Sequence, residues 1–217
     1  MRWRSTIAYE HWVKVGAEIL KHYQQQSPPV FLFGLSAGGM LAYQVASEGQ
    51  RVRGIIATCI LDQRNSLVTR RTARHPLIGA FSKPLMGIVH RIVGAFKIPM
   101  KLVANMKAIA NDSALASEMM KDQRASGASV PLTFLYTMLT PDIQVEPEAF
   151  TACPFLLAHP GDDRWTALDL SLIFYQRLAC VKEVAILEGA GHCPIEPLEV
   201  SPTGSTLYSI HRKKSFY

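Results

Sequence analysis

A serine between two glycines is the first candidate for chemistry in this chain of 217 residues. Gly34, Ser36 and Gly38 form the pattern G-x-S-x-G, which arises by chance roughly once in fifteen chains of this length. Its context is more selective. The apolar run 30–33 predicts a buried strand before the pattern, and residues 40–47 have the spacing of a helix after it. A sharp turn between strand and helix raises a serine Oγ so that it can act as a nucleophile.

A nucleophilic serine needs a general base, and the base needs a carboxylate to orient it. Two later segments supply these groups: His159-Pro160-Gly161-Asp162-Asp163 and Gly189-Ala190-Gly191-His192. Each segment follows an apolar run that predicts a strand, so each lies at a carboxyl end, where open α/β sheets place their sites. The order along the chain is Ser, Asp, His.

The elements that must position these residues alternate between strand and helix, which predicts an α/β fold with a mostly parallel sheet of about four strands. The expected strands are 30–33, 52–60, 154–158 and 184–187, and the expected core helices are 6–25, 40–47 and 168–178. We expect four regions in the chain. They are 1–61, the N-terminal part of the core; 62–150, a helical cap insertion; 151–200, the C-terminal part of the core; and 201–217, a polar tail. Four prolines (Pro76, Pro84, Pro99 and Pro131) should divide the insertion into short helices.

With these motifs in this order, the chain resembles the α/β-hydrolases, in particular capped serine hydrolases such as lysophospholipases, monoacylglycerol lipases and esterases. The resemblance spans residues 6–198. It implies that Ser36 is the nucleophile, Asp163 the orienting acid and His192 the general base, with the backbone N–H of Ala37 binding an oxyanion. Asp162 is a competing acid. Asp62 is a second one, because some relatives place the acid after that strand.

The resemblance implies an enzyme that cleaves carboxylic esters of apolar acyl groups, such as lysophospholipids or monoacylglycerols, through an acyl-enzyme. The family normally has more strands before the serine, and a loop of the His-Gly type supplies a second oxyanion N–H. In this chain only 35 residues precede Ser36, and they contain no such loop. We therefore expect a truncated hydrolase. The alternative function is a catalytically impaired fragment that binds a lipid or a protein. Because a truncated hydrolase lacks the preceding strands, the strand 30–33 should be an exposed edge that favours a homodimer.

The formal net charge of +6 is unevenly distributed. Nine basic residues and no Asp or Glu lie between Gln63 and Asn111, within the expected cap. No recognition motif for nucleic acid accompanies this charge, so we exclude nucleic acid as a partner. The basic residues indicate either a patch that contacts a membrane surface or an anionic substrate, or simply a solvated face that balances the acidic remainder of the chain. The cap should turn an apolar inner face to the substrate, formed by Leu85, Met86, Ile88, Phe96, Met100, Leu102 and Met106.

The remaining composition argues for a chain without cofactors. The four cysteines and seven histidines show no metal-binding spacing, and there is no phosphate-binding glycine loop. No apolar run reaches the length of a membrane-spanning helix, and the N-terminus has no signal-peptide pattern. We expect a cytoplasmic protein, peripheral at a membrane if the basic cap contacts lipid.

Overall fold

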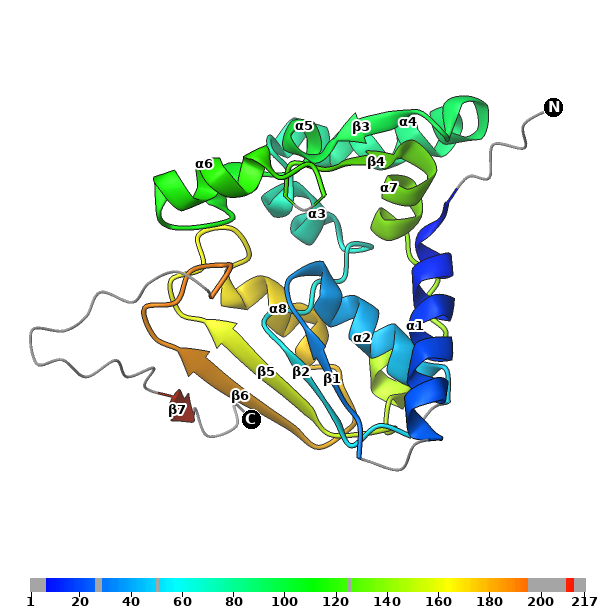
Figure 1. Ribbon diagram of the computed structural model, residues 1–217, viewed down its shortest axis with the longest axis vertical. Coiled ribbons are helices and arrows are strands. Elements are labelled where there is room, and N and C mark those ends of the chain that lie inside the picture. Colours follow the sequence, from blue (N-terminus) through cyan, green and yellow to red (C-terminus); the bar gives the residue numbers. More distant parts are fainter. Residues whose placement is uncertain (1–6, 26–28, 50, 125, 195–209, 213–217) are drawn as a thin grey trace, which may run out of the picture.

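The computed structural model describes residues 7–25, 29–49, 51–124, 126–194 and 210–212, and it is built around one twisted sheet (Figure 1). Its four parallel strands are β1 (Phe31–Gly34), β2 (Gly54–Ala57), β5 (Phe155–Pro160) and β6 (Lys182–Leu187), adjacent in that order. These match the four predicted strands, and the α/β class with a mostly parallel sheet is confirmed. Parallel strands place all their carboxyl ends at one edge, so the segments after β1, β5 and β6 meet there.

A fifth strand, β7 (Ile210–Arg212), pairs antiparallel with β6. It lies in the segment expected to be a polar tail. Three residues are too few to show the alternation by which a strand is recognised in a sequence.

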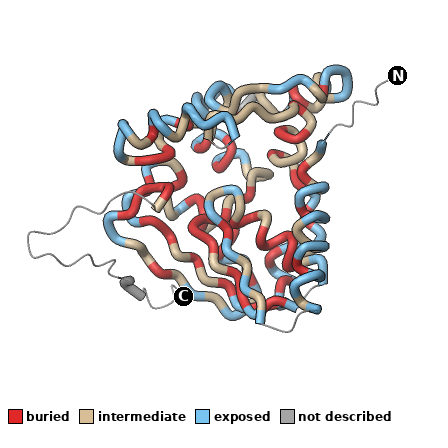
Figure 2. The backbone as a smooth tube through the Cα atoms, in the orientation of Figure 1, coloured by how far each residue is buried: buried red, intermediate tan, exposed pale blue. Residues whose placement is uncertain are grey.

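Three helices cover one face of the sheet: α1 (Tyr9–Gln24), α2 (Ala37–Ser47) and α8 (Leu168–Tyr175) (Figure 1). The core between them and the sheet is centred on Tyr43, whose ring lies 4.6 Å from that of Phe150 and 5.0 Å from that of Phe174. Figure 2 shows buried residues concentrated along the strands and the inner sides of these helices. This packing holds α2, which begins directly after Ser36.

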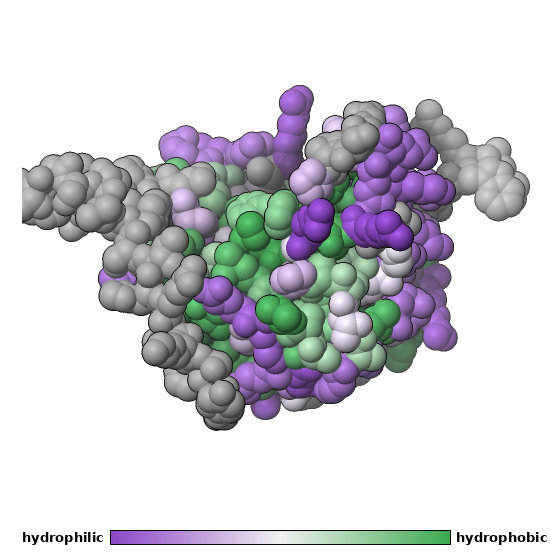
Figure 3. All heavy atoms as spheres, turned by 90° about the horizontal axis from the view of Figure 1, so that it is seen from below, coloured by the Kyte–Doolittle hydropathy of each residue, from purple (hydrophilic) through white to green (hydrophobic). Residues whose placement is uncertain are grey.

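The opposite face of the sheet is apolar and much less covered. Phe33, Ile56 and Leu156 are paired in register, so their side chains share this face. The side chains of Phe31 and Phe33 are 59% and 66% exposed. Figure 3 shows a broad apolar area, framed by polar residues, on the lower side of the molecule. Within the described residues β1 has a partner strand only on its β2 side, so it forms an edge of the sheet.

Residues between β2 and β5 form a mainly helical layer over the carboxyl ends of the strands (Figure 1). It contains α3 (Ser66–Thr72), α4 (Pro76–Val93), α5 (Met100–Val103), α6 (Ser113–Lys121), α7 (Leu132–Leu139), and two 3-10 turns, Met106–Ala108 and Pro147–Ala149. It also contains an antiparallel pair that the sequence did not predict, β3 (Lys97–Pro99) with β4 (Ser129–Pro131).

The prolines act as predicted with one exception. Pro76 begins α4, and Pro99 and Pro131 precede α5 and α7. Pro84 lies inside α4 and does not end it, so the prediction of a break there is wrong. A proline inside a helix costs about 3 kcal/mol, and α4 offsets this cost by packing along α3 and α7.

Across the described ranges, no helix combines the length and apolarity needed to span a bilayer.

Candidate active site

The turn after β1 holds Ser36 in a strained conformation. Ser36 has φ 54° and ψ −124°, and within the described residues it is the only non-glycine residue with positive φ. Its N–H donates to Oγ1 of Thr58, 3.0 Å away, and the Gly38 N–H donates to the Leu35 carbonyl at 2.8 Å. Such strain is maintained only where surrounding contacts fix the backbone, and it is typical of functional turns.

Two glycines allow α2 to approach β1 and the segment that follows β2. A Cβ on Gly34 would lie 2.3 Å from the Gly38 carbonyl oxygen, and one on Gly39 would lie 1.9 Å from that of Cys59. Gly38 has open space where its Cβ would be. The steric requirement therefore falls on Gly34 and Gly39, and the second glycine of the G-x-S-x-G pattern is not needed for close packing.

The loop after β6 brings His192 to this turn. Its Nε2 lies 2.8 Å from Oγ of Ser36, and its Nδ1 lies 2.9 Å from Oδ2 of Asp163. The imidazole is buried against the ring of Trp165, 4.7 Å between centroids. Of the residues singled out in the sequence, the structure thus joins Ser36, His192 and Asp163 in one hydrogen-bonded row.

Asp163 accepts several hydrogen bonds. Its Oδ1 accepts from the N–H groups of Trp165 (2.8 Å) and Thr166 (2.7 Å), and its Oδ2 accepts from the Thr166 hydroxyl (2.7 Å). Burial by itself raises the pKa of this carboxyl, but the hydrogen bond and charge of His192 and the donors of Thr166 outweigh it and hold the pKa well below its usual range. Asp163 is therefore ionised at neutral pH and favours a proton on Nδ1 of His192.

The two competing acids lie elsewhere. Asp162 is exposed, and its backbone carbonyl accepts from Nδ2 of Asn111 at 3.0 Å. Asp62 is buried, but its carboxylate binds Arg64, with Oδ2 2.9 Å from the guanidinium. Neither carboxylate forms a hydrogen bond with His192, so neither occupies the position of the acid in this row.

Several positioning residues could not be found from the sequence. Thr166 and Thr58 contact the row from segments without a recognisable motif. His159 is buried, with Nδ1 2.8 Å from the Pro160 carbonyl oxygen and Nε2 2.9 Å from that of Thr166, so it is a structural histidine beside the acid loop. The indole N–H of Trp165 donates to the Thr72 carbonyl in α3 at 2.9 Å, which ties the acid loop to the helical layer above.

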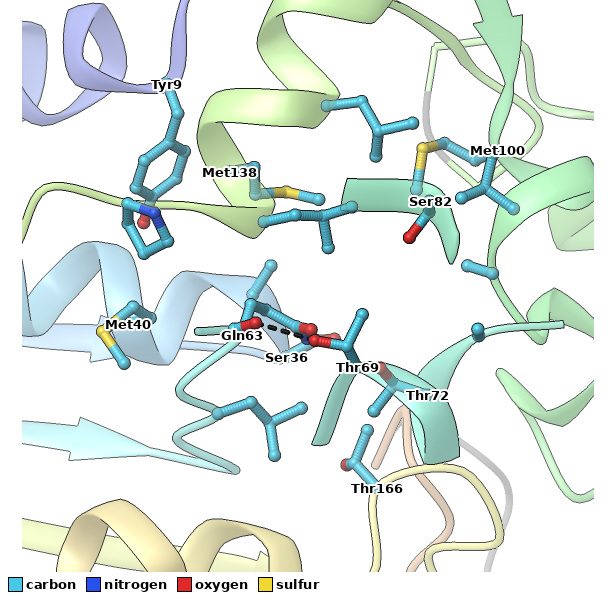
Figure 4. Close-up of a pocket in the computed structure, with 18 of the residues that line it drawn as sticks. Tyr9, Ser36, Met40, Gln63, Thr69, Thr72, Ser82, Met100, Met138 and Thr166 are labelled. Carbon is cyan, nitrogen blue, oxygen red and sulfur yellow. Dashed lines mark hydrogen bonds between the residues drawn. The ribbon is translucent and has the colours of Figure 1, made fainter. Parts of the chain in front are cut away.

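A cavity of about 170 Å³ opens at Ser36, and Ala37, the first residue of α2, lines it too (Figure 4). Most of its wall is apolar. Met138 and Met100 lie across the cavity from Ser36 in Figure 4. The hydroxyls of Thr69 and Thr72 donate to carbonyl oxygens of their own segment, so they are already satisfied. Gln63 differs, because its Oε1 is buried without a hydrogen-bond partner in the described part of the chain.

The layer above the sheet contributes to this cavity differently from what the sequence suggested. Of the seven residues expected to form an apolar inner face, Met100 lines the cavity, while Met86 and Met106 are buried within the layer. Leu85, Ile88, Phe96 and Leu102 are exposed, so the prediction is wrong for them. A helix with apolar residues on two sides cannot be oriented from periodicity alone. Cavity-lining residues such as Ile78 and Ser82 lie on another side of α4.

Potential metal ligands are scattered. Over the described residues, no three His, Cys, Asp or Glu side chains are grouped so that they could hold a metal ion.

A parallel sheet with a serine on a strained strand-to-helix turn, followed by an acid and a histidine on later strand ends, defines an α/β-hydrolase. The family model described as serine aminopeptidase, S33, matches residues 9–197, so the chain belongs to this family. The resemblance read from the sequence is thus confirmed at the level of the family.

Solved structures give the same fold. A monoacylglycerol lipase of Paleococcus ferrophilus has a TM-score of 0.62 at 16% identity, covering 86% of this chain and 68% of the lipase. A hypothetical protein of Pseudomonas aeruginosa has a TM-score of 0.58 at 14% identity (91% and 66% covered). The α/β hydrolase GrgF of Penicillium sp. sh18 has a TM-score of 0.53 at 18% identity (86% and 65% covered). The chain thus spans about two thirds of the length of these proteins. No curated protein sequence matches it.

Proposed function

We propose that this chain is a serine hydrolase that cleaves carboxylic esters of apolar acyl groups, such as monoacylglycerols or lysophospholipids, through an acyl-enzyme. The observation that carries the proposal is the row formed by Ser36, His192 and Asp163 where it opens into an apolar cavity. A histidine that accepts from the serine and donates to a buried carboxylate is the arrangement that activates a serine nucleophile.

In the first half of the reaction, Oγ of Ser36 attacks the ester carbonyl carbon while Nε2 of His192 takes the hydroxyl proton. Asp163 holds the imidazole in the required tautomer and stabilises the positive charge that forms on it. The Ala37 N–H stabilises the oxyanion, because the first N–H groups of a helix have no partner within it.

In the second half, the C–O bond to the alcohol breaks and His192 returns the proton to the leaving oxygen. Water then attacks the acyl-enzyme with His192 again as base. Ser36 is regenerated and the carboxylic acid is released.

The lining of the cavity favours an ester over a peptide N-terminus. An aminopeptidase substrate carries a positive α-amino group next to the bond that is cut, and a carboxylate is the group that binds it. The described residues that line the cavity include no Asp or Glu. Polarizable methionines such as Met40, Met100 and Met138 adapt instead to flexible apolar chains.

A fluorophosphonate probe tests the proposal, because it forms a covalent bond only with an activated serine. We expect the wild type to label and Ser36→Ala to remain unlabelled. Ser47→Ala is the matched control, since Ser47 ends the same helix and its hydroxyl bonds the Tyr43 carbonyl. A folded wild type that does not label would contradict the enzymatic proposal and favour a lipid- or protein-binding module.

A further inference from the structure

Helix α4 turns a row of apolar side chains away from the protein. Leu85, Ile88 and Ile92 follow one another at three and four residues, so they lie on one side of the helix. They are 63%, 69% and 80% exposed. Leu77 is exposed on the same side two turns earlier, and Phe96 is exposed just after the helix. We call these five residues the α4 stripe.

The opposite side of α4 is firmly packed, which fixes the outward direction of the stripe. Met86 is buried in a cluster with Leu135, and the ring of His90 stacks on Tyr136 at 4.1 Å. A Cβ on Gly79 would lie 2.6 Å from the Cα of Arg70, so α4 and α3 touch at their backbones. The stripe cannot be buried by rotating the helix without breaking these contacts. Soluble proteins rarely expose contiguous apolar surface of this kind unless it binds something.

The charged residues that neighbour the stripe in the sequence are all positive. Arg91 lies on α4 beside it, and Lys97 and Lys101 follow its end; all three are exposed. No Asp or Glu occurs from Gln63 to Asn111, and none of these three cations forms an ion pair with another described residue. An apolar stripe bordered by uncompensated Lys and Arg is typical of a helix that lies in the interface of an anionic membrane.

We infer that the α4 stripe docks on an anionic lipid surface, with its apolar side chains in the acyl boundary and the three cations at the headgroups. Charge complementarity selects this occupant over a second copy of the chain, which would bring the same positive charges to the contact. Both the cations near an anionic surface and the apolar side chains buried in the acyl boundary would contribute to binding.

The link between docking and catalysis rests on the proposed function, whereas the docking itself does not. Ile78 and Ser82 belong to α4 and line the cavity at Ser36. A helix that lies on the membrane with one side and borders the cavity with another brings that cavity to the lipid layer. An apolar ester can then enter from the membrane without crossing water.

Flotation with lipid vesicles tests the docking without any need for activity. We compare vesicles of phosphatidylcholine with vesicles containing about 30 mol% phosphatidylserine, at an ionic strength of about 0.15 M. The wild type and Ser36→Ala should bind the anionic vesicles equally, and at least about tenfold more strongly than the neutral ones. The triple variant Leu85→Ser/Ile88→Ser/Ile92→Ser should lose at least about tenfold in binding to the anionic vesicles.

Matched variants separate the stripe from general surface effects. The apolar control is Val15→Ser/Ile19→Ser/Val181→Ser, which changes three side chains that are also more than half exposed but lie outside α4. The charge variant Arg91→Glu/Lys97→Glu/Lys101→Glu should abolish the preference for anionic vesicles, and Lys14→Glu/Lys21→Glu/Arg53→Glu, at exposed sites elsewhere, should keep it. Labelling by a fluorophosphonate in lipid-free buffer should be the same for every variant that retains Ser36, which shows that the fold is intact.

Three results would overturn the inference. One is equal binding of the wild type and the stripe variant; another is equal binding of the wild type to neutral and anionic vesicles. The third is a wild type that ignores vesicles but forms a dimer that the stripe variant lacks, which would make α4 a contact between copies. Failure of labelling with normal flotation would instead reject the hydrolase and leave the docking intact.

Discussion

The Oγ of Ser36 lies 2.8 Å from Nε2 of His192, although 156 residues separate them in the chain. The serine is fixed by the strained turn after β1, and the histidine is fixed by Asp163 and Trp165 on the loop after β5. The distance therefore depends on three strand ends, which only an intact parallel sheet holds in place.

Asp163→Asn should lower kcat for a short soluble ester by about 10³- to 10⁴-fold. The amide that replaces the carboxylate can donate to Nδ1 of His192, which favours the tautomer that cannot accept the serine proton. Asp162→Asn is the matched control and should retain close to wild-type kcat, because that side chain is exposed. Steady-state hydrolysis of a nitrophenyl ester measures both, and a larger loss in Asp162→Asn would reassign the acid.

The same carboxylate makes stability depend on pH. The pKa of Asp163 is lower in the folded chain than its ordinary value, so the unfolded chain binds more protons in that range. Its contribution is complete above about pH 4, the ordinary range of Asp, and is lost as the pH falls through the folded pKa. Glu146 shows the same direction. Urea unfolding between about pH 3 and 7 should show a shallower acid decline for Asp163→Asn than for the wild type; parallel declines would contradict this.

Much of the fold could be predicted because its signals are local. Four apolar runs mark the parallel strands, and the residues that follow three of them are the ones that the sheet brings together. Asp163 could be placed ahead of Asp162 only by analogy. The structure gives the physical reason, because Oδ1 and Oδ2 of Asp163 receive the donors of Trp165 and Thr166.

What the sequence did not reveal depends on contacts between distant segments. Asp62 has the type and position of an acid after a strand, but its partner Arg64 is held by Glu146, 82 residues further on. Likewise, the outward side of α4 is set by packing against α3 and α7, and Pro84 is tolerated within it for the same reason. Such pairings leave no periodic trace in a sequence.

Arg64 joins the two ends of the helical layer. It binds Asp62 at the beginning of the layer and Glu146 at its end, and Arg177 of the core binds Glu146 and Glu148. Arg64→Met leaves the buried Asp62 carboxylate without its main partner, so we expect a loss of about 2–4 kcal/mol in the free energy of unfolding. Arg71→Met, which breaks only an exposed pair with Asp169, should cost less than about 1 kcal/mol. Urea denaturation compares the two, and equal losses would contradict the prediction.

Gln63 lines the cavity, and its buried Oε1 lacks a hydrogen-bond partner in the described residues. A substrate group that binds its amide would gain about 1 kcal/mol, so Gln63→Leu should raise KM for a glycerol ester by about fivefold to tenfold with a smaller change in kcat. Met138→Leu, which conserves an apolar wall, should change KM by less than about twofold. An unchanged KM in Gln63→Leu would show that the amide does not contact the substrate.

The edge of the sheet at β1 should cause self-association. Its outer side has no partner strand among the described residues, and Phe31 and Phe33 extend an apolar face beside it. Exposed edges of this kind pair with other chains, and a lysine placed on them opposes pairing. We expect dimers in size-exclusion chromatography with light scattering, and Phe33→Lys should shift the mass toward the monomer. Val181→Lys, at a side chain that is as exposed but lies outside β1, should leave the dimer in place. A wild type that stays monomeric at about 100 μM would reject the edge as a contact, because the Kd of any dimer would then lie above that concentration.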